Sequence, residues 1–411
     1  MVTLLFNNSS IMKKYFTALL SLLFFIFSFV LQAQNNKDNY VVLVSMDGFR
    51  WDYGKQFNLP NLKQISKKGV HAKSMKPSYP SKTFPNHYAI VTGLYPDHHG
   101  IINNVFYDAQ LNESFSLSSN AKNDSRFYGG NPIWNLAEQQ GVKTASFFWP
   151  GSDIDNRNPS IFKKYDNKIP YGARIDTVLK WLQLPEKQRP HLVTLYFDEP
   201  DHTGHNFGPL SPENKKMVIK MDSIMGELSR RLDQLPIGKQ INLIIVSDHG
   251  MANISNDKKV AVLDYLKPEW LGYKDVINPI MSLQAKAGFQ DSIANALKKV
   301  PHIKFWKASE VPERLHYGTN PRVHDFVIEA NKGWSLVTKK SQNIKGGTHG
   351  YDNNEKDMHA IFYAKGPAFK INKRVKTFKN VSVYPLIANI LDLQVGEIDG
   401  KLSDVESMLA N

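Results

Sequence analysis

The chain contains no cysteine among its 411 residues, so disulfide bonds and lipid attached to a thiol are excluded. It also lacks internal repeats, low-complexity tracts and the dense lysine and arginine clusters typical of nucleic-acid-binding proteins. A polymeric nucleic acid partner is therefore not indicated. With 42% hydrophobic and 22% charged residues, the chain is long enough for one large α/β domain and an insertion.

The longest apolar run lies near the N-terminus. A basic start at Met12 to Lys14, an apolar core from Phe16 to Leu31 and a plausible cleavage edge at Ala33 predict a secretory signal over residues 1–33. Because the core is about 16 residues long and a spanning helix needs about 20, we expect cleavage with no membrane span left, and a retained anchor is the alternative. The protein would then be exported, either periplasmic or secreted. Losing two lysines with the leader takes the formal net charge from +13 to +11, which suits an anionic substrate or contact with anionic envelope surfaces.

A hydroxyl stands at a predicted helix start within Pro80 to His87. Thr83 follows a turn and precedes the apolar run Tyr88 to Val91. It would lie where unpaired backbone N–H groups and the helix dipole favour an anion, which is a suitable place to attack a phosphate. A threonine hydroxyl is a poor nucleophile at neutral pH, so this chemistry requires a metal ion or a general base nearby.

Acidic and histidine side chains follow three strongly apolar runs that read as buried strands of a parallel sheet. Asp47 follows 41–46, Asp201 and His205 follow 192–197, and Asp248 with His249 follow 241–247; His349 lies in a glycine-rich turn. Because the carboxyl ends of such strands open onto one crevice, we expect these side chains to converge. Carboxylates and imidazoles are ordinary zinc ligands, although manganese or cobalt would also be accepted.

The order of these motifs resembles the nucleotide pyrophosphatase/phosphodiesterase family of the alkaline phosphatase superfamily. The matching segments, between residues 40 and 393, are Asp47, Lys82 to His87, Thr92 to Gly100, Asp201 to His205, Asp248 to Met251 and Thr348 to Gly350. The resemblance implies two zinc ions and a double displacement through a phosphothreonine. One zinc would be held by Asp47, Thr83, Asp248 and His249, and the other by Asp201, His205 and His349. Asn104 would bind the phosphoryl group.

The segment Trp149 to Asp153 resembles nucleotide-cleaving members of that family, in which it lies beside the nucleoside pocket. Aromatic rings there could stack on a base, an interaction worth roughly 1–3 kcal/mol per base. Ordinary core packing is the alternative for each ring. The residues predicted to bind a small nucleotide or phosphodiester substrate are Phe84, Tyr196, Trp149, Asp153, Tyr165 and Lys82. The remaining histidines in the motifs, His87 and His98, and also His359, are predicted to be structural.

Alternating strands and helices predict an α/β fold with a mostly parallel central sheet and helices on both faces. The resemblance implies an alkaline phosphatase-like core over residues 34–255 and 344–411, and the pattern between them predicts a small α+β insertion over 256–343. We expect helices at 169–184, 215–235 and 289–299, a strand pair at 325–329 and 334–337, and a polar surface excursion at 106–131.

Three classes of function fit these residues. The first is a diesterase or pyrophosphatase that releases a nucleoside monophosphate; a choline-phosphodiester hydrolase of the same family is a variant of it. The second is an alkaline phosphatase-type phosphomonoesterase, which would need further cationic groups. The segment Trp149 to Asp153 has no Lys and Arg pair, although Arg157 follows closely. The third is a non-catalytic, metal-dependent binding module.

Overall fold

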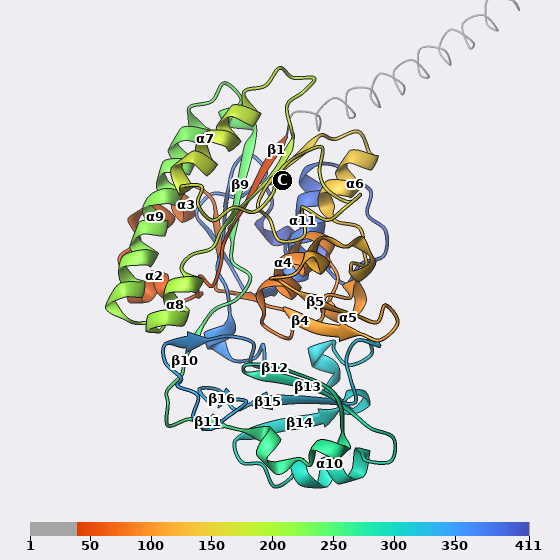
Figure 1. The fold of residues 1–411 in the computed structure, drawn as a ribbon. Coiled ribbons are helices and arrows are strands. Elements are labelled where there is room, and N and C mark those ends of the chain that lie inside the picture. The colour runs from red at the N-terminus through yellow and green to blue at the C-terminus, as the bar shows by residue number, and fades with distance from the viewer. Residues whose placement is uncertain (1–38, 411) are drawn as a thin grey trace, which may run out of the picture.

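An eight-stranded mixed sheet forms the centre of the molecule in the computed structural model, which describes residues 39–410 (Figure 1). Its strand order is β19-β2-β18-β9-β1-β8-β6-β7. Only β18 runs antiparallel to its two neighbours, β9 and β2. The strands are β1 (Tyr40–Met46), β2 (Val70–Ala72), β6 (Thr144–Phe147), β7 (Ile161–Lys163), β8 (Leu192–Phe197), β9 (Ile241–Val246), β18 (Phe362–Lys365) and β19 (Lys373–Val375).

The three central strands explain why this sheet forms. Every residue of β1, β8 and β9 is buried, and all but one or two residues of each strand are apolar. Such runs are stable only where both faces of a sheet are covered. The register pairs Met46 with Phe197 and Ser45 with Val246, so the three strands end at the same edge.

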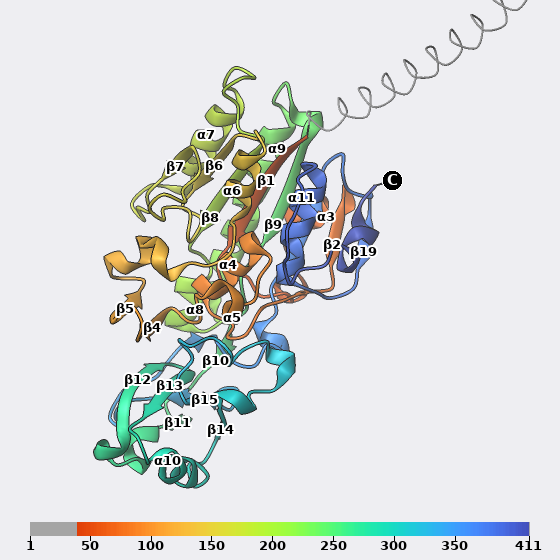
Figure 2. The ribbon, with the colours of Figure 1, turned by 90° about the vertical axis from the view of Figure 1, so that its right-hand side faces the viewer.

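Helices cover both faces of the sheet, as expected (Figure 2). One face packs against α3 (Pro60–Lys67), α7 (Tyr171–Leu182) and α9 (Pro212–Asp233), and the other against α4 (Thr83–Thr92), α6 (Ile133–Gln139) and α11 (Val383–Ile390). The side chains of β1 alternate between the two apolar clusters, with Val42 and Val44 in one and Val41 and Leu43 in the other. The helices predicted at 169–184 and 215–235 are confirmed within a few residues at each end.

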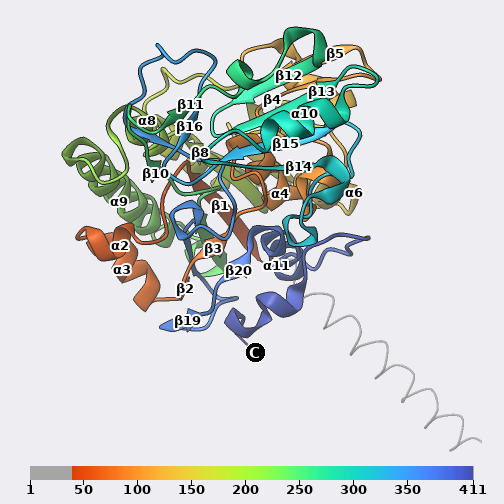
Figure 3. The same cartoon turned by 90° about the horizontal axis from the view of Figure 1, so that it is seen from below.

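A second, smaller sheet lies below the carboxyl ends of the central strands (Figures 1 and 3). Its antiparallel order is β12 (Leu271–Ile277), β13 (Ile280–Ala285), β15 (Phe326–Ala330) and β14 (Ile303–Lys307). Helix α10 (Gln290–Leu297) buries Ile293 and Leu297 in the apolar cluster of this sheet. We call these four strands the small sheet.

The strand pair predicted at 325–329 and 334–337 is wrong. Strand β16 (Ser335–Leu336) pairs in parallel with β11 (Lys259–Val260) instead of with β15. A turn closed by the Trp334 N–H and the Asn331 carbonyl precedes β16. The N–H groups of Ser335 and Val337 then donate to the carbonyls of Lys258 and Val260. Local periodicity carries no information about this distant partner.

The surface excursion predicted at 106–131 is also wrong in part, because it contributes to the core. Strands β4 (Val105–Asp108) and β5 (Glu113–Ser116) form a hairpin. Phe106 and Phe115 stack with ring centroids 4.9 Å apart, and Phe115 and Phe127 are fully buried. The aromatic rings interspersed among the polar residues carry the packing.

The predicted secretory leader, residues 1–33, lies outside the described residues. Within residues 39–410, none of the helices has both the length and the apolar character needed to cross a bilayer.

Helix α3 receives its N-terminal cap from a different helix. Its own N-cap residue, Leu59, provides no side-chain acceptor. The buried carboxylate of Asp222 on α9 instead accepts from the Asn61 N–H at 3.1 Å, the Leu62 N–H at 2.8 Å and the Asn61 amide at 2.8 Å. A carboxylate at this position satisfies the first free N–H groups of the helix and complements its dipole.

We therefore expect Asp222→Ala to lower the free energy of unfolding by about 2 kcal/mol, because it leaves buried donors without an acceptor. Urea denaturation of the purified variant measures the change. The neighbouring exposed Ser223→Ala is the control and should stay within about 0.5 kcal/mol of the wild type. Equal stabilities of the two variants would contradict this account of the cap.

Candidate active site

The carboxyl ends of β1, β8 and β9 bring three aspartates together. Asp47 follows β1, Asp248 follows β9, and Asp201 begins α8 (Asp201–Phe207) shortly after β8. The Asp201 N–H donates to the Asp47 carbonyl at 3.0 Å. Gly48 has φ +67°, and a Cβ there would lie 2.8 Å from the Asp201 Cβ, so only glycine permits this approach.

One cluster of candidate metal ligands combines Asp201, His205 and His349, whose ligand atoms lie within 4.8 Å of one another. The two histidine Nε2 atoms are 3.1 Å apart. The Asp201 carboxylate oxygens lie 3.4 Å from the His205 Nε2 and 3.7 Å from the His349 Nε2. Asp201 and His205 are four residues apart on α8, so they share one face of the helix. His349 comes from the loop after β17 (Gly347–Thr348).

A second cluster surrounds the His249 imidazole. Its Nε2 lies 2.9 Å from the Asp248 Oδ2, 3.5 Å from the Asp47 Oδ1 and 3.3 Å from the Thr83 Oγ1. The structure thus brings together all seven residues that the sequence predicts as metal ligands. Asp201 adjoins both clusters, because it also groups with Asp47 and His249 within 4.8 Å.

Backbone carbonyls fix the tautomers of the three clustered histidines. The Nδ1 atoms of His205, His249 and His349 lie 2.9, 2.8 and 2.8 Å from the carbonyl oxygens of Gly347, Gly250 and Ser81. A carbonyl oxygen only accepts, so each Nδ1 carries the proton and each Nε2 keeps a lone pair. This arrangement is typical of metal-binding histidines. His87 also directs its Nδ1 at a backbone carbonyl, that of Thr83 at 3.0 Å, and it groups with Asp47 and Asp248. Its Nε2, however, is engaged by the Ser45 hydroxyl at 2.8 Å, in line with a structural role.

The electrostatics of the crevice fit a divalent cation. Within the crevice, each of the three aspartates has one buried carboxylate oxygen that accepts no hydrogen bond from the described residues: Asp47 Oδ1, Asp201 Oδ1 and Asp248 Oδ2. Burial, together with the neighbouring Asp248, raises the pKa of Asp47 well above its usual value. Burial, and then the nearby His249, lowers the pKa of His349, which keeps this ring neutral and able to act as a ligand. Bound cations would neutralise the carboxylates and use the free oxygens.

Thr83 is the first residue of α4, as predicted. The residue before it, Lys82, is extended at φ −114° and ψ 154°. The Asn104 Oδ1 accepts from the Phe84 N–H at 3.0 Å, which leaves both N–H donors of the Asn104 amide for another partner beside Thr83. The start of α4, the Thr83 hydroxyl and the amide donors of Asn104 therefore lie next to one another.

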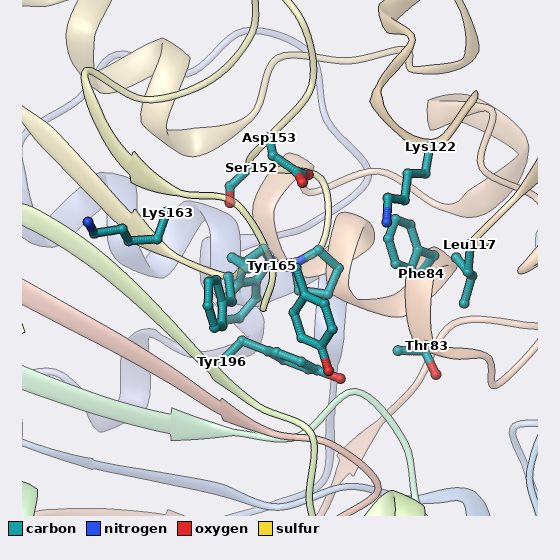
Figure 4. A pocket seen from close by; sticks show the side chains of 12 residues that line it. Thr83, Phe84, Leu117, Lys122, Ser152, Asp153, Lys163, Tyr165 and Tyr196 are labelled. Carbon is teal, nitrogen blue, oxygen red and sulfur yellow. The ribbon is translucent and has the colours of Figure 1, made fainter. Parts of the chain in front are cut away.

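A cavity of about 210 Å³ opens beside Thr83 (Figure 4). Five of the six residues predicted to bind substrate line it, namely Phe84, Trp149, Asp153, Tyr165 and Tyr196. Trp149 is only 1% exposed, and its Nε1 donates to the His87 carbonyl at 3.2 Å, so it is also a core residue. Lys82 is not among the lining residues; its ammonium donates to the Asn278 carbonyl at 2.6 Å. A contact between Lys82 and substrate stays a prediction.

Pro150 and Ser152 also line the cavity, within the segment Trp149 to Asp153 that the sequence analysis places beside a nucleoside pocket. Sequence reasoning missed the other lining residues, which are Leu117, Lys122, Phe148 and Lys163. Leu117 and Lys122 belong to the segment predicted as a surface excursion, in which the phenylalanines are the one sequence signal of burial. It also missed a second role of Tyr196. The Tyr196 hydroxyl donates to the Asp47 Oδ2 at 2.6 Å, so one ring both lines the cavity and holds a candidate metal ligand.

Comparison with known proteins gives a consistent picture. The family model "Type I phosphodiesterase / nucleotide pyrophosphatase" matches residues 41–352. A venom phosphodiesterase from Crotalus durissus collilineatus is 41% identical over 384 residues, which cover 90% of this chain and 46% of the relative. Ectonucleotide pyrophosphatase/phosphodiesterase family member 3 from Rattus norvegicus is 39% identical, with 90% and 44% covered. The chain thus spans about half the length of these relatives.

Solved structures are similar over their whole length. Murine ectonucleotide pyrophosphatase/phosphodiesterase 5, as an inactive variant in complex with AMP, superposes with a TM-score of 0.86 at 34% identity and covers 90% of this chain and 100% of that chain. The human counterpart gives a TM-score of 0.86 at 34% identity, with 91% and 100% covered.

The geometry of the first cluster leads to a test of metal binding. His349→Ala should weaken binding of a probe ion, Zn²⁺, by more than about 10-fold, because it removes one of three ligands. Metal analysis after loading and dialysis measures the change. His202→Ala is the matched control, since His202 lies on the same helix as His205 but is exposed and outside both clusters. Wild-type metal content in a folded His349→Ala variant would remove His349 from the ligand set.

Proposed function

Because this chain belongs to the type I phosphodiesterase/nucleotide pyrophosphatase family, we propose that it is a metal-dependent hydrolase that splits nucleotide diesters and pyrophosphates and releases nucleoside monophosphates. The observation that carries this proposal is the position of Thr83. Its hydroxyl lies at a helix start, 3.3 Å from the His249 Nε2, and lines an aromatic cavity. A phosphoryl group held there would meet the nucleophile and the candidate metal ligands together.

We propose that the metals are two zinc ions. Asp47, Thr83, Asp248 and His249 would hold one, and Asp201, His205 and His349 the other. The support is the donor set of carboxylate oxygens and Nε2 lone pairs, which is the set that zinc prefers in catalytic sites. When bound, such a pair would supply electrostatic stabilisation to the attacking and leaving oxygens of an in-line displacement.

The residues of the chain suggest a double displacement. The Thr83 Oγ1 attacks phosphorus, so that an oxygen–phosphorus bond forms at the threonine while the bond to the leaving oxygen breaks. Water then cleaves the phosphothreonine and releases the nucleoside monophosphate. The Thr83 N–H at the start of α4 and the Asn104 amide can donate to the non-bridging oxygens, whereas the Phe84 N–H is already used by Asn104. Asn104 is thus assigned a catalytic role.

The cavity beside Thr83 suits a nucleoside. The rings of Phe84, Tyr165 and Tyr196 offer faces for a base, and Lys122 and Lys163 add positive charge at the same cavity. The similar murine structure is a complex with AMP, which supports this choice of ligand. Small nucleotides are therefore the proposed substrates.

We propose that the fold is alkaline phosphatase-like, with a catalytic core over residues 34–255 and 344–411 and an insertion over 256–343. The support is that the small sheet has its own apolar cluster, whereas the strands on either side return to the central sheet. We also propose that the chain is exported after its leader is cleaved, because the leader pattern agrees with relatives named as venom proteins or ectonucleotide enzymes.

Product analysis with ATP tests the function. We expect AMP and pyrophosphate, because the nucleoside cavity adjoins Thr83 and would place the α-phosphorus there. ADP and phosphate would support the phosphomonoesterase alternative. No reaction with ATP, together with release of p-nitrophenol from p-nitrophenyl phosphorylcholine, would support a choline-phosphodiester hydrolase. If none of these substrates reacts, the non-catalytic binding module is the alternative that remains.

Thr83→Ala tests the nucleophile. We expect it to lower kcat with bis(p-nitrophenyl) phosphate by at least about 1,000-fold, because no other group would form the covalent intermediate. The metal content should stay near that of the wild type. Thr83→Ser keeps a hydroxyl and should keep measurable turnover. Full activity in Thr83→Ala would remove Thr83 from the mechanism.

A further inference from the structure

The residue before the nucleophile is a buried lysine whose charge is not directed at the cavity. Lys82 is the N-cap of α4 and is 4% exposed. Its ammonium donates to the Asn278 carbonyl at 2.6 Å. Among the described residues, no carboxylate oxygen lies within 4.0 Å of the Lys82 Nζ. The positive charge at the cavity beside Thr83 comes from two other lysines, Lys122 and Lys163.

Asn278 lies at the tip of the small sheet that faces the site. It and Pro279 form the turn between β12 and β13, which is closed by the Ile277 and Ile280 pair. Its side-chain Oδ1 accepts from the Leu336 N–H at 2.9 Å, and its Nδ2 donates to the Ser335 hydroxyl at 3.3 Å. Both groups of the side-chain amide are therefore used to fix this turn.

The surrounding backbone leaves space for the lysine. Gly350 has φ +123°, and a Cβ there would lie 2.6 Å from the Lys82 Cε and 2.9 Å from the Pro279 Cδ. Any larger residue at position 350 would clash with both Lys82 and Pro279. Gly350 directly follows His349, a candidate metal ligand, so the lysine passes between the metal-binding loop and the small sheet.

Stability alone does not account for this lysine. Burial lowers the pKa of Lys82 to about 7, so the site opposes the charged form of the side chain, and one neutral carbonyl returns only part of the cost of removing this donor from water. An apolar side chain of similar length would fill the same space without the desolvation penalty. The hydrogen bond to the Asn278 carbonyl does, however, restrict geometry. Because it is short and its donor is buried, it limits where the main chain of residue 82 can lie.

We propose that Lys82 is a positioning residue, which fastens the helix start that carries Thr83 to the Asn278 turn of the small sheet. This inference rests on the proposed function, in which the Thr83 Oγ1 attacks phosphorus. The small sheet then contributes to the reaction without touching substrate, since it sets the position of the nucleophile relative to both ligand clusters. Small displacements of a reacting group are costly, because attack requires a near-ideal approach.

Lys82→Met is the first test. It keeps the length of the side chain and removes the donor. We expect kcat with bis(p-nitrophenyl) phosphate to fall about 10- to 100-fold, while KM stays within about twofold and the metal content is unchanged. Lys63→Met, at an exposed lysine of α3, should behave as the wild type. Lys122→Met, at the cavity, should instead raise KM. An unchanged kcat in Lys82→Met, or a loss confined to KM, would overturn the proposal.

Asn278→Ala provides an independent test from the other side of the contact. It releases the turn and keeps the carbonyl, so we expect a smaller fall in kcat at constant KM. The double variant should be no slower than Lys82→Met, to within about twofold, because the two changes break the same link. Multiplicative losses would show that the link does not exist. If Lys82→Met does not fold, an unchanged kcat in Asn278→Ala overturns the proposal by itself.

A measurement without turnover separates this inference from the proposed function. Hydrogen exchange of residues 79–87 should be faster in Lys82→Met than in the wild type, with no change in α9. Equal exchange in both proteins would contradict the proposed link between Lys82 and the Asn278 turn, whether or not the wild type is active. An inactive wild type, together with faster exchange in Lys82→Met, would count against the proposed function but would still support this link.

Discussion

Three carboxylates share one buried crevice, and the rest of the site depends on how their repulsion is balanced. Asp47, Asp201 and Asp248 are brought together because parallel strands in register must end at the same edge. Each keeps an oxygen that accepts no hydrogen bond from the described residues. Such an arrangement is unfavourable without a compensating positive charge, and the neighbouring Nε2 lone pairs make metal cations the suitable source. The surrounding hydrogen bonds hold ligands in place for such a charge.

Much of this could be predicted from the sequence, because the decisive signals are local. Continuous apolar runs mark β1, β8 and β9, and the aspartates and histidines follow them directly, so the convergence of the ligands follows from sheet geometry. Residues whose roles depend on distant partners could not be found in this way. Lys122 comes from a segment that appears polar, β16 pairs with β11, and the cap of α3 comes from Asp222 on another helix. None of these contacts leaves a periodic pattern.

The small sheet and the site are joined by more than one contact. Besides the Asn278 turn, the Asp352 N–H donates to the Glu329 Oε1 on β15 at 3.1 Å. The hydroxyl of Tyr351 donates to the Trp334 carbonyl at 2.7 Å, in the turn that follows β15. Ser81 in turn donates to the Tyr351 carbonyl at 2.6 Å. The loop that carries His349 is therefore held between the nucleophile turn and the small sheet. Both sides of the site depend on this loop, which explains why segments far apart in sequence must fold together before the site is complete.

The hydrogen bond from the Tyr196 hydroxyl to Asp47 has an evolutionary consequence. A mutation that reshapes the pocket at Tyr196 would also release a carboxylate on which the metal centre depends. Diversification of base preference is therefore constrained on that wall, where the Tyr165 ring lies 6.3 Å from the Tyr196 ring, and the opposite wall, with Leu117 and Lys122, is free to vary (Figure 4). Related proteins with other base preferences should accordingly keep a tyrosine at this position of β8. They should differ instead in the segment after β5 that carries Leu117 and Lys122.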